Sequence, residues 1–103
     1  MKKKTINKKK ISKECYELDA SFLDWLRVRL PVYLREASTI IDLDWRRFKY
    51  KGEELTQRQL IERMIYLLKI IEGKDFWDGK EEYEEPCNEI LEIWSTVFHA
   101  MWW

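Results

Sequence analysis

Apolar residues that recur every three or four positions predict amphipathic helices, and the stretch Thr56–Glu72 shows this period most clearly. Thr56 is a good N-cap, and Gln59 at the third helical position completes a capping-box pattern. Gly73 follows the expected end, where a residue of left-handed conformation commonly closes a helix. The apolar face comprises Leu60, Ile61, Met64, Ile65, Leu67, Leu68 and Ile71.

An earlier stretch predicts a first helix that starts near Asp19 or Ser21 and reaches about Ser38. Ser21 and Asp24 resemble a capping box. Proline removes one intrahelical hydrogen bond and crowds the preceding turn, so Pro31 predicts a kink or short break that opens a second segment. The apolar face comprises Phe22, Trp25, Leu26, Leu30, Tyr33, Leu34 and Ala37.

The third main helix is expected over Pro86–Met101, because proline fits the first position of a helix. Trp102 and Trp103 follow it, and we expect this pair to be buried in the chain or in a partner, since exposed ends usually fray. The apolar face comprises Cys87, Ile90, Leu91, Trp94, Val97, Phe98 and Met101.

Between the first two helices, apolar and polar residues alternate from Ile41 to Arg46, which favours an extended segment within residues 41–51. Gly52 marks a turn after it. Three Gly and two Pro argue against an all-β fold. The pattern therefore predicts an all-α bundle of three main helices, with the last two antiparallel and the first, kinked at Pro31, laid across them.

The length of 103 residues and the distribution of charge along the chain indicate how the chain is organised. Residues 1–14 read as a flexible lysine-rich arm and residues 15–103 as a single helical domain. Residues 1–51 carry a balance of +7 and residues 52–103 a balance of −7. This asymmetry indicates a chain folded back on itself or a homo-oligomer, unless it only reflects the arm and an acidic loop.

No apolar run suits a membrane span and no signal peptide is evident, so a cytoplasmic protein without a membrane partner is expected.

Catalytic chemistry has little support in the sequence. His99 is the one histidine, and neither Cys15 nor Cys87 belongs to a metal-binding or disulfide pattern. Asp42 and Asp44 lack further ligands for a metal ion. With three glycines there is no glycine-rich phosphate loop. We therefore expect no enzyme activity, no metal and no cofactor.

A basic and aromatic stretch is the first candidate site. Aromatic rings stack on bases and cations pair with phosphates, so it could hold a nucleotide-derived ligand. The alternative is that two of its rings, Trp45 and Phe48, enter the core while the cations face water. The candidate ligand-binding residues are Trp45, Arg46, Arg47, Phe48, Lys49, Tyr50 and Lys51.

An acidic loop over residues 74–85 is the second candidate, as a surface for a protein partner. Trp and Tyr are common interface anchors because they bury a large area with few rotatable bonds. The alternative is that these aromatic side chains pack internally. The candidate partner-binding residues are Phe76, Trp77, Glu82 and Tyr83.

Three hydrophobic stretches, Trp25–Leu34, Leu60–Tyr66 and Phe98–Trp103, resemble a group of small tailed-phage proteins that end in Leu-Trp-Trp and have no established activity. This chain departs from that pattern with Met101 in place of leucine and with a different connection over residues 38–55. The resemblance implies a mostly helical phage-derived protein in the cytoplasm of a bacterial host, and it carries over no catalytic residues.

Two functions follow as hypotheses. The first is a phage counter-defence protein that sequesters a nucleotide-derived immune signal without turnover, in pockets formed between subunits. The alternative is an inhibitor that binds a host defence protein through the acidic aromatic surface, and a structural phage protein is a further reading.

Overall fold

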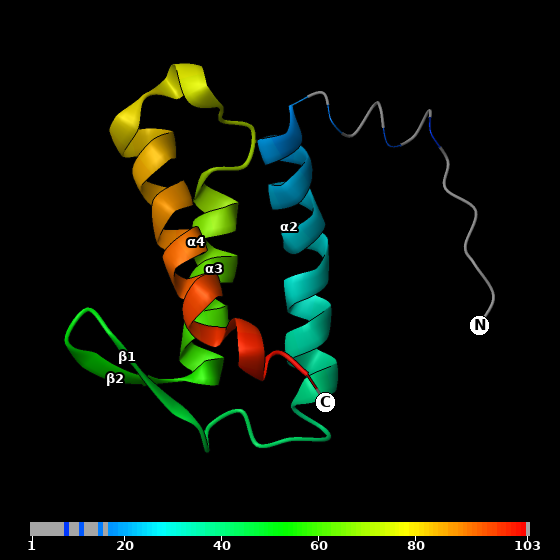
Figure 1. Ribbon diagram of the computed structural model, residues 1–103, viewed down its shortest axis with the longest axis vertical. Helices are drawn as coiled ribbons and strands as arrows, with labels where there is room; N and C mark the ends of the chain where they lie inside the picture. The colour runs from blue at the N-terminus through cyan, green and yellow to red at the C-terminus, as the bar shows by residue number, and fades with distance from the viewer. Residues whose placement is uncertain (1–7, 9–10, 12–14, 16, 103) are drawn as a thin grey trace.

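Three helices dominate the computed structural model, which describes residues 8, 11, 15 and 17–102 (Figure 1). The predicted arm over residues 1–14, apart from Lys8 and Ile11, lies outside the described residues, as does Trp103. Along the chain the elements are α2 (Leu18–Ala37), β1 (Arg47–Tyr50), β2 (Glu53–Thr56), α3 (Gln57–Ile70), η1 (Phe76–Asp78), η2 (Lys80–Glu84), α4 (Glu85–Val97) and η3 (Phe98–Ala100).

The helices lie side by side, with α3 antiparallel to both α2 and α4 (Figure 1). The predicted antiparallel packing of the last two helices is confirmed, whereas the first helix runs alongside them rather than across them. Each fully buried Leu, Ile or Val side chain contributes roughly 1.5–3 kcal/mol of transfer free energy. The fully buried core includes Leu26, Leu60, Ile61, Met64, Ile90, Ile93 and Val97.

A short antiparallel hairpin corrects the all-α prediction, because β1 pairs with β2 with Phe48 opposite Leu55. Lys51 and Gly52 connect the strands, and both have positive φ angles, as a tight hairpin turn requires. The extended segment begins only at Arg47, later than residue 41. Before it the Asp42 carboxylate accepts a hydrogen bond from the Asp44 N–H at 2.9 Å, which favours a turn over a strand.

Helix α2 continues through Pro31 without the predicted kink or break (Figure 1). Leu26 and Leu30 before Pro31 are buried in the core, and Leu34 after it packs against the core. Their packing holds the helix together, because tertiary burial outweighs local propensity in most protein helices. The helix begins at Leu18, one residue before the predicted start near Asp19, and the Ser21 N–H already donates to the Glu17 carbonyl at 3.1 Å, which excludes the alternative start at Ser21.

The start of α3 matches its sequence signature. The Thr56 hydroxyl accepts a hydrogen bond from the Gln59 N–H at 3.2 Å, and the Gln59 side-chain oxygen accepts one from the Thr56 N–H at 2.9 Å. Both bonds satisfy donors that a helix start leaves unpaired. Gly73 has a φ of +80°, so the predicted left-handed residue beyond the helix is also confirmed.

The buried face of α4 is rotated from the predicted one. Ile90, Ile93 and Val97 form its core side, whereas Leu91 and Phe98 are exposed. The α-helix ends at Val97, earlier than predicted, and the short η3 helix carries the chain toward α2 (Figure 1). The sequence offered two overlapping apolar faces here, and packing against α3 selected the one that contains Ile93.

The C-terminal segment is held by its backbone rather than by a buried tryptophan. The Gln57 side-chain amide, which is buried, donates to the Ala100 carbonyl at 3.0 Å. The Tyr33 hydroxyl donates to the Trp102 carbonyl at 3.0 Å. The Trp102 ring is 59% exposed, so the predicted burial of this tryptophan within the chain is wrong.

We expect Gln57→Ala to destabilise the fold by about 1–3 kcal/mol, because it leaves the Ala100 carbonyl without its buried donor. Urea unfolding followed by circular dichroism measures the change. Gln59→Ala, which removes a more exposed cap, is the control and should cost only about 0.5–1.5 kcal/mol. Equal stability of Gln57→Ala and the wild type would contradict this role for the amide.

Candidate functional site

Only part of the hairpin stretch that was predicted to bind a ligand is exposed in the fold. Trp45 is 79% exposed, which excludes the alternative that its ring enters the core. Tyr50 is buried and Phe48 is half-buried, so these two rings pack inward instead of facing a ligand. The exposed part consists of Trp45 with the cations Arg46, Arg47, Lys49 and Lys51.

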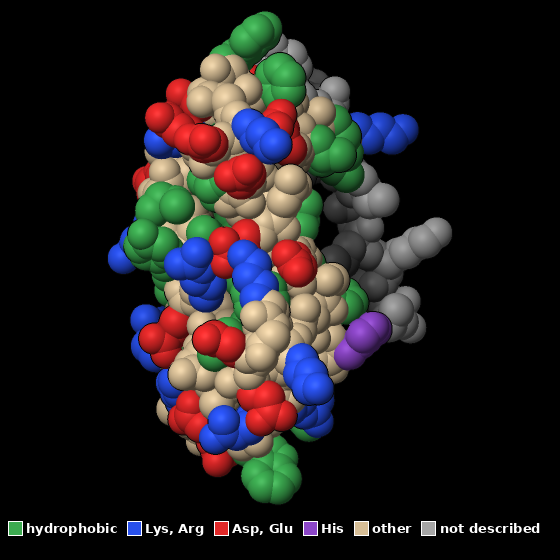
Figure 2. Space-filling model, turned by 90° about the vertical axis from the view of Figure 1, so that its left-hand side faces the viewer, with side chains coloured by type: hydrophobic (Ala, Val, Ile, Leu, Met, Phe, Trp, Pro, Cys, Tyr) green, Lys and Arg blue, Asp and Glu red, His purple; other side chains and the backbone are tan. Residues whose placement is uncertain are grey.

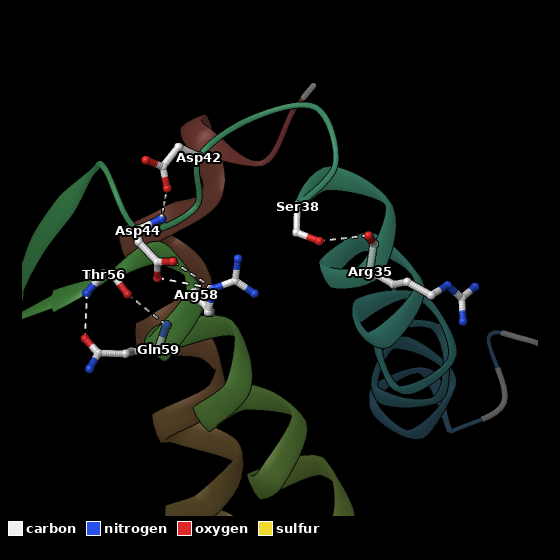
Figure 3. A network of polar contacts seen from close by, with 7 residues as sticks. All are labelled: Arg35, Ser38, Asp42, Asp44, Thr56, Arg58 and Gln59. Atoms are coloured by element: carbon white, nitrogen blue, oxygen red, sulfur yellow. Dashed lines mark hydrogen bonds and ion pairs between the residues drawn. The ribbon is translucent and has the colours of Figure 1, made fainter.

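The loop that carries Trp45 is fastened to the start of α3 (Figure 3). The Arg58 guanidinium reaches both Asp44 carboxylate oxygens at 3.2 Å, and the Arg58 N–H donates to the Leu43 carbonyl at 3.1 Å. The Gln57 N–H donates to the Arg46 carbonyl at 3.2 Å. The backbone on both sides of Trp45 is therefore fixed, while the ring faces solvent.

Three acidic residues reduce the positive charge of this stretch. Glu54 is directly across from Lys49 in the hairpin, and Glu53 is across from Tyr50. Lys51 lies 3.8 Å from the Glu89 carboxylate of α4. Arg46 and Arg47 are the cations of the stretch that lie closest in sequence to the exposed ring and are least opposed by these carboxylates.

A compact ionic cluster joins the hairpin to α3 and α4. The Arg63 guanidinium donates to both Glu89 oxygens, at 2.8 and 3.1 Å, and the Glu89 side chain is only 14% exposed. The hydrogen bond from Arg63, together with its charge and that of Lys51, lowers the pKa of Glu89. Burial, and next to it the negative charge of Glu89, raises the pKa of the Tyr50 hydroxyl. Such a cluster fixes structure and does not resemble a reactive centre.

The loop over residues 75–85, here called the acidic aromatic loop, presents the most exposed aromatic side chain. Trp77 is 88% exposed and Phe76 is also exposed, with ring centroids 5.7 Å apart in an edge-to-face arrangement. Carboxylates surround the pair along the chain. They are Asp75, Asp78, Glu81, Glu82, Glu84 and Glu85.

Reciprocal hydrogen bonds give this loop a defined shape. The Asp75 carboxylate accepts from the Trp77 N–H at 2.8 Å, and the Asp78 carboxylate accepts from the Asp75 N–H at 2.7 Å. Lys74 pairs with Glu82 at 3.0 Å across the turn. These bonds reduce the number of conformations that must be lost when the rings meet a partner.

Tyr83 belongs to the core and not to the surface predicted for it. It is 7% exposed, and its hydroxyl donates to the Asp19 carboxylate at 2.8 Å, which ties the loop to the first turn of α2. Burial raises the pKa of Tyr83, and the hydrogen bond to Asp19 adds to the increase. Phe76, Trp77 and Glu82 remain as the accessible members of the predicted partner surface.

The surface over α4 and the hairpin carries both signs of charge. Figure 2 shows acidic and basic side chains interspersed over this face, with hydrophobic groups projecting at both of its ends. The apolar groups of this face therefore lie at its two ends, one at the η1 turn and the other at the loop before β1. The two candidate sites lie at opposite ends of the bundle.

An apolar groove between α2 and α4 was missed by the sequence reasoning. It has a volume of about 740 Å³, and its apolar walls are Leu18, Phe22, Trp25, Trp94 and Phe98. The signal was available in the first helix, because Leu18, Trp25, Val28 and Val32 repeat at helical spacing outside the buried face. The sequence pattern places Trp25 on the buried face of the helix, but in the structure Trp25 is 47% exposed and belongs to this second apolar side.

The described residues offer little for catalysis. Among residues 8, 11, 15 and 17–102, no three His, Cys, Asp or Glu side chains gather as metal ligands would. Burial raises the pKa of the Cys87 thiol, which disfavours a reactive thiolate. Within the same residues, no helix combines the length and the apolar character that crossing a membrane needs.

Comparisons with protein-family models, with curated proteins and with solved structures return no match for this chain.

The ionic cluster predicts a pH dependence of stability. The pKa of Glu89 is lowered in the fold, so its contribution is complete above its ordinary pKa of 4.5 and is lost as the pH falls through the lower folded value. The free energy of unfolding should fall over this acidic range in the wild type. In Glu89→Gln the free energy of unfolding should fall less over the same range. Urea titrations at several pH values measure the difference.

Arg63→Gln is the matched variant, because it removes the same ion pair from the other side. The pH dependence of its free energy of unfolding should also be smaller than that of the wild type. An unchanged acidic slope in both variants would show that the pair contributes no stability.

Proposed function

We propose that the protein acts by binding and not by turnover, as an inhibitor that occupies a basic surface of a partner protein through the acidic aromatic loop. The exposed Trp77, fixed by the Asp75 and Asp78 bonds, is the single observation that carries this proposal. Aromatic anchors ringed by charge are typical of interface hot spots.

Charge complementarity defines the partner in chemical terms. Six carboxylates over residues 75–85 stand against a single lysine, Lys80, so the loop favours a cationic surface with an apolar pocket for the two rings. A nucleic-acid-binding protein offers such a surface. The setting, a phage counter-defence protein in the cytoplasm of a bacterial host, rests on the resemblance to small tailed-phage proteins.

The test is capture of partners from a bacterial lysate by the full chain, followed by calorimetry with each purified partner. Trp77→Ala should weaken binding by roughly 30-fold or more, as expected for loss of a hot spot worth about 2 kcal/mol. Glu82→Lys should also weaken binding, and wild-type affinity should fall as salt increases.

Tyr66→Ala is the control, since Tyr66 is an exposed aromatic residue on α3 outside the acidic aromatic loop. It should bind as the wild type does. The proposal fails if Trp77→Ala captures the same proteins with equal affinity, or if Tyr66→Ala weakens binding as much.

A nucleotide-derived ligand is the second candidate, and the exposed Trp45 beside Arg46 and Arg47 is the observation that favours it. Stacking on one ring contributes roughly 1–3 kcal/mol, so phosphate contacts are needed for tight binding. Because Tyr50 and Phe48 face inward, the surface offers one platform where the sequence suggested three.

Calorimetry with cyclic nucleotides and ADP-ribose derivatives tests this candidate. Trp45→Ala should abolish the heat of binding, while Tyr50→Phe should retain it because that hydroxyl is buried. An absence of binding across the panel would remove this function and leave the protein-binding proposal untouched.

A further inference from the structure

Helix α2 has two apolar sides, and the bundle covers only one of them. Leu23, Leu26 and Leu30 pack into the core. A second stripe of apolar side chains repeats at spacings of seven, three and four residues and faces away from α3. It comprises Leu18, Trp25, Val28 and Val32, with Leu18 62% exposed and Val28 65% exposed.

This stripe borders two hollows. One is the groove of about 740 Å³ that α2 forms with Trp94 and Phe98. The other is a hollow of about 410 Å³ further along α2, lined by Val28, Arg29, Val32 and Tyr33. A ridge beside grooves is the shape that packs against another helix.

The charges of α2 indicate which kind of helix packs against this stripe. Asp24 lies in its first half and Arg35 in its second, 11 residues apart, which is about three turns and places both on the same edge of the stripe. Two carboxylates, those of Asp19 and Asp24, precede the three arginines of the helix, and Glu36 follows them. A parallel neighbour of the same sequence would meet like charges, and an antiparallel one would meet opposite charges.

We propose that the stripe binds a second copy of this chain, with the two α2 helices antiparallel about a two-fold axis near Val28. In this arrangement Trp25 lies opposite Val32 of the second copy. In this register Asp24 comes within two residues, about 3 Å along the helix axis, of the position opposite Arg35 of the second copy, a distance that the long arginine side chain spans. A two-fold interface uses one patch on both subunits, which a self-complementary stripe provides.

The dimer is independent of the proposed partner, since the stripe contains no residue of the acidic aromatic loop. Light scattering coupled to size exclusion should give twice the monomer mass of 12.8 kDa. Val28→Asp places two like charges beside the axis and should give a monomer. Leu91→Asp changes an exposed leucine on α4 and should remain a dimer.

A charge exchange tests the antiparallel register. Asp24→Arg and Arg35→Asp should each be monomeric alone, form a heterodimer when mixed, and recover the homodimer when combined in one chain. Asp24 also pairs with Arg27 in its own helix, so circular dichroism should confirm that each variant retains the wild-type helix content.

Three results would overturn the proposal: a wild-type mass of 12.8 kDa at every concentration, a dimer that survives Val28→Asp, or charge variants that fail to pair when mixed. The last result alone would reject the antiparallel register and so the arrangement proposed here.

Discussion

The hydrogen bond from the buried Gln57 amide to the Ala100 carbonyl connects the three helices at one end of the bundle. Gln57 begins α3, Ala100 ends the segment after α4, and the neighbouring Trp102 carbonyl is held by Tyr33 of α2. A buried carbonyl without a donor is costly, so the Gln57 bond holds η3 against the start of α3. The Tyr33 bond then holds the segment after η3 beside α2, and together the two bonds place the C-terminal segment.

Local signals in the sequence predicted local structure well. The capping box at Thr56 and the left-handed Gly73 depend on bonds within a few residues, and both are confirmed. Pro31, the face of α4 and the extent of the extended segment were decided by tertiary packing, which periodicity does not encode. The sequence indicates one extended segment before the turn at Gly52, but not the partner strand Glu53–Thr56, which has no clear alternation of apolar and polar residues.

The candidate sites show the same limit. Composition located both aromatic stretches, yet it could not tell which rings face solvent. Trp45 and Trp77 are exposed because turns hold them away from the core, whereas Tyr50 and Tyr83 are buried and the Tyr83 hydroxyl donates to Asp19. The apolar stripe on α2 was hidden for a related reason, since one helix with two apolar sides has no single dominant face.

Within the described residues the sheet has two strands, so each strand has an edge without a paired strand, and such an edge is a template for strand addition by other chains. Here the residues with exposed side chains on the strands are largely charged, namely Arg47, Lys49, Glu53 and Glu54. Adding another strand would bring such charges close together beside an isolated ribbon, which discourages aggregation through this route. The hairpin thus protects the chain against unwanted β-pairing while it carries Tyr50 into the core.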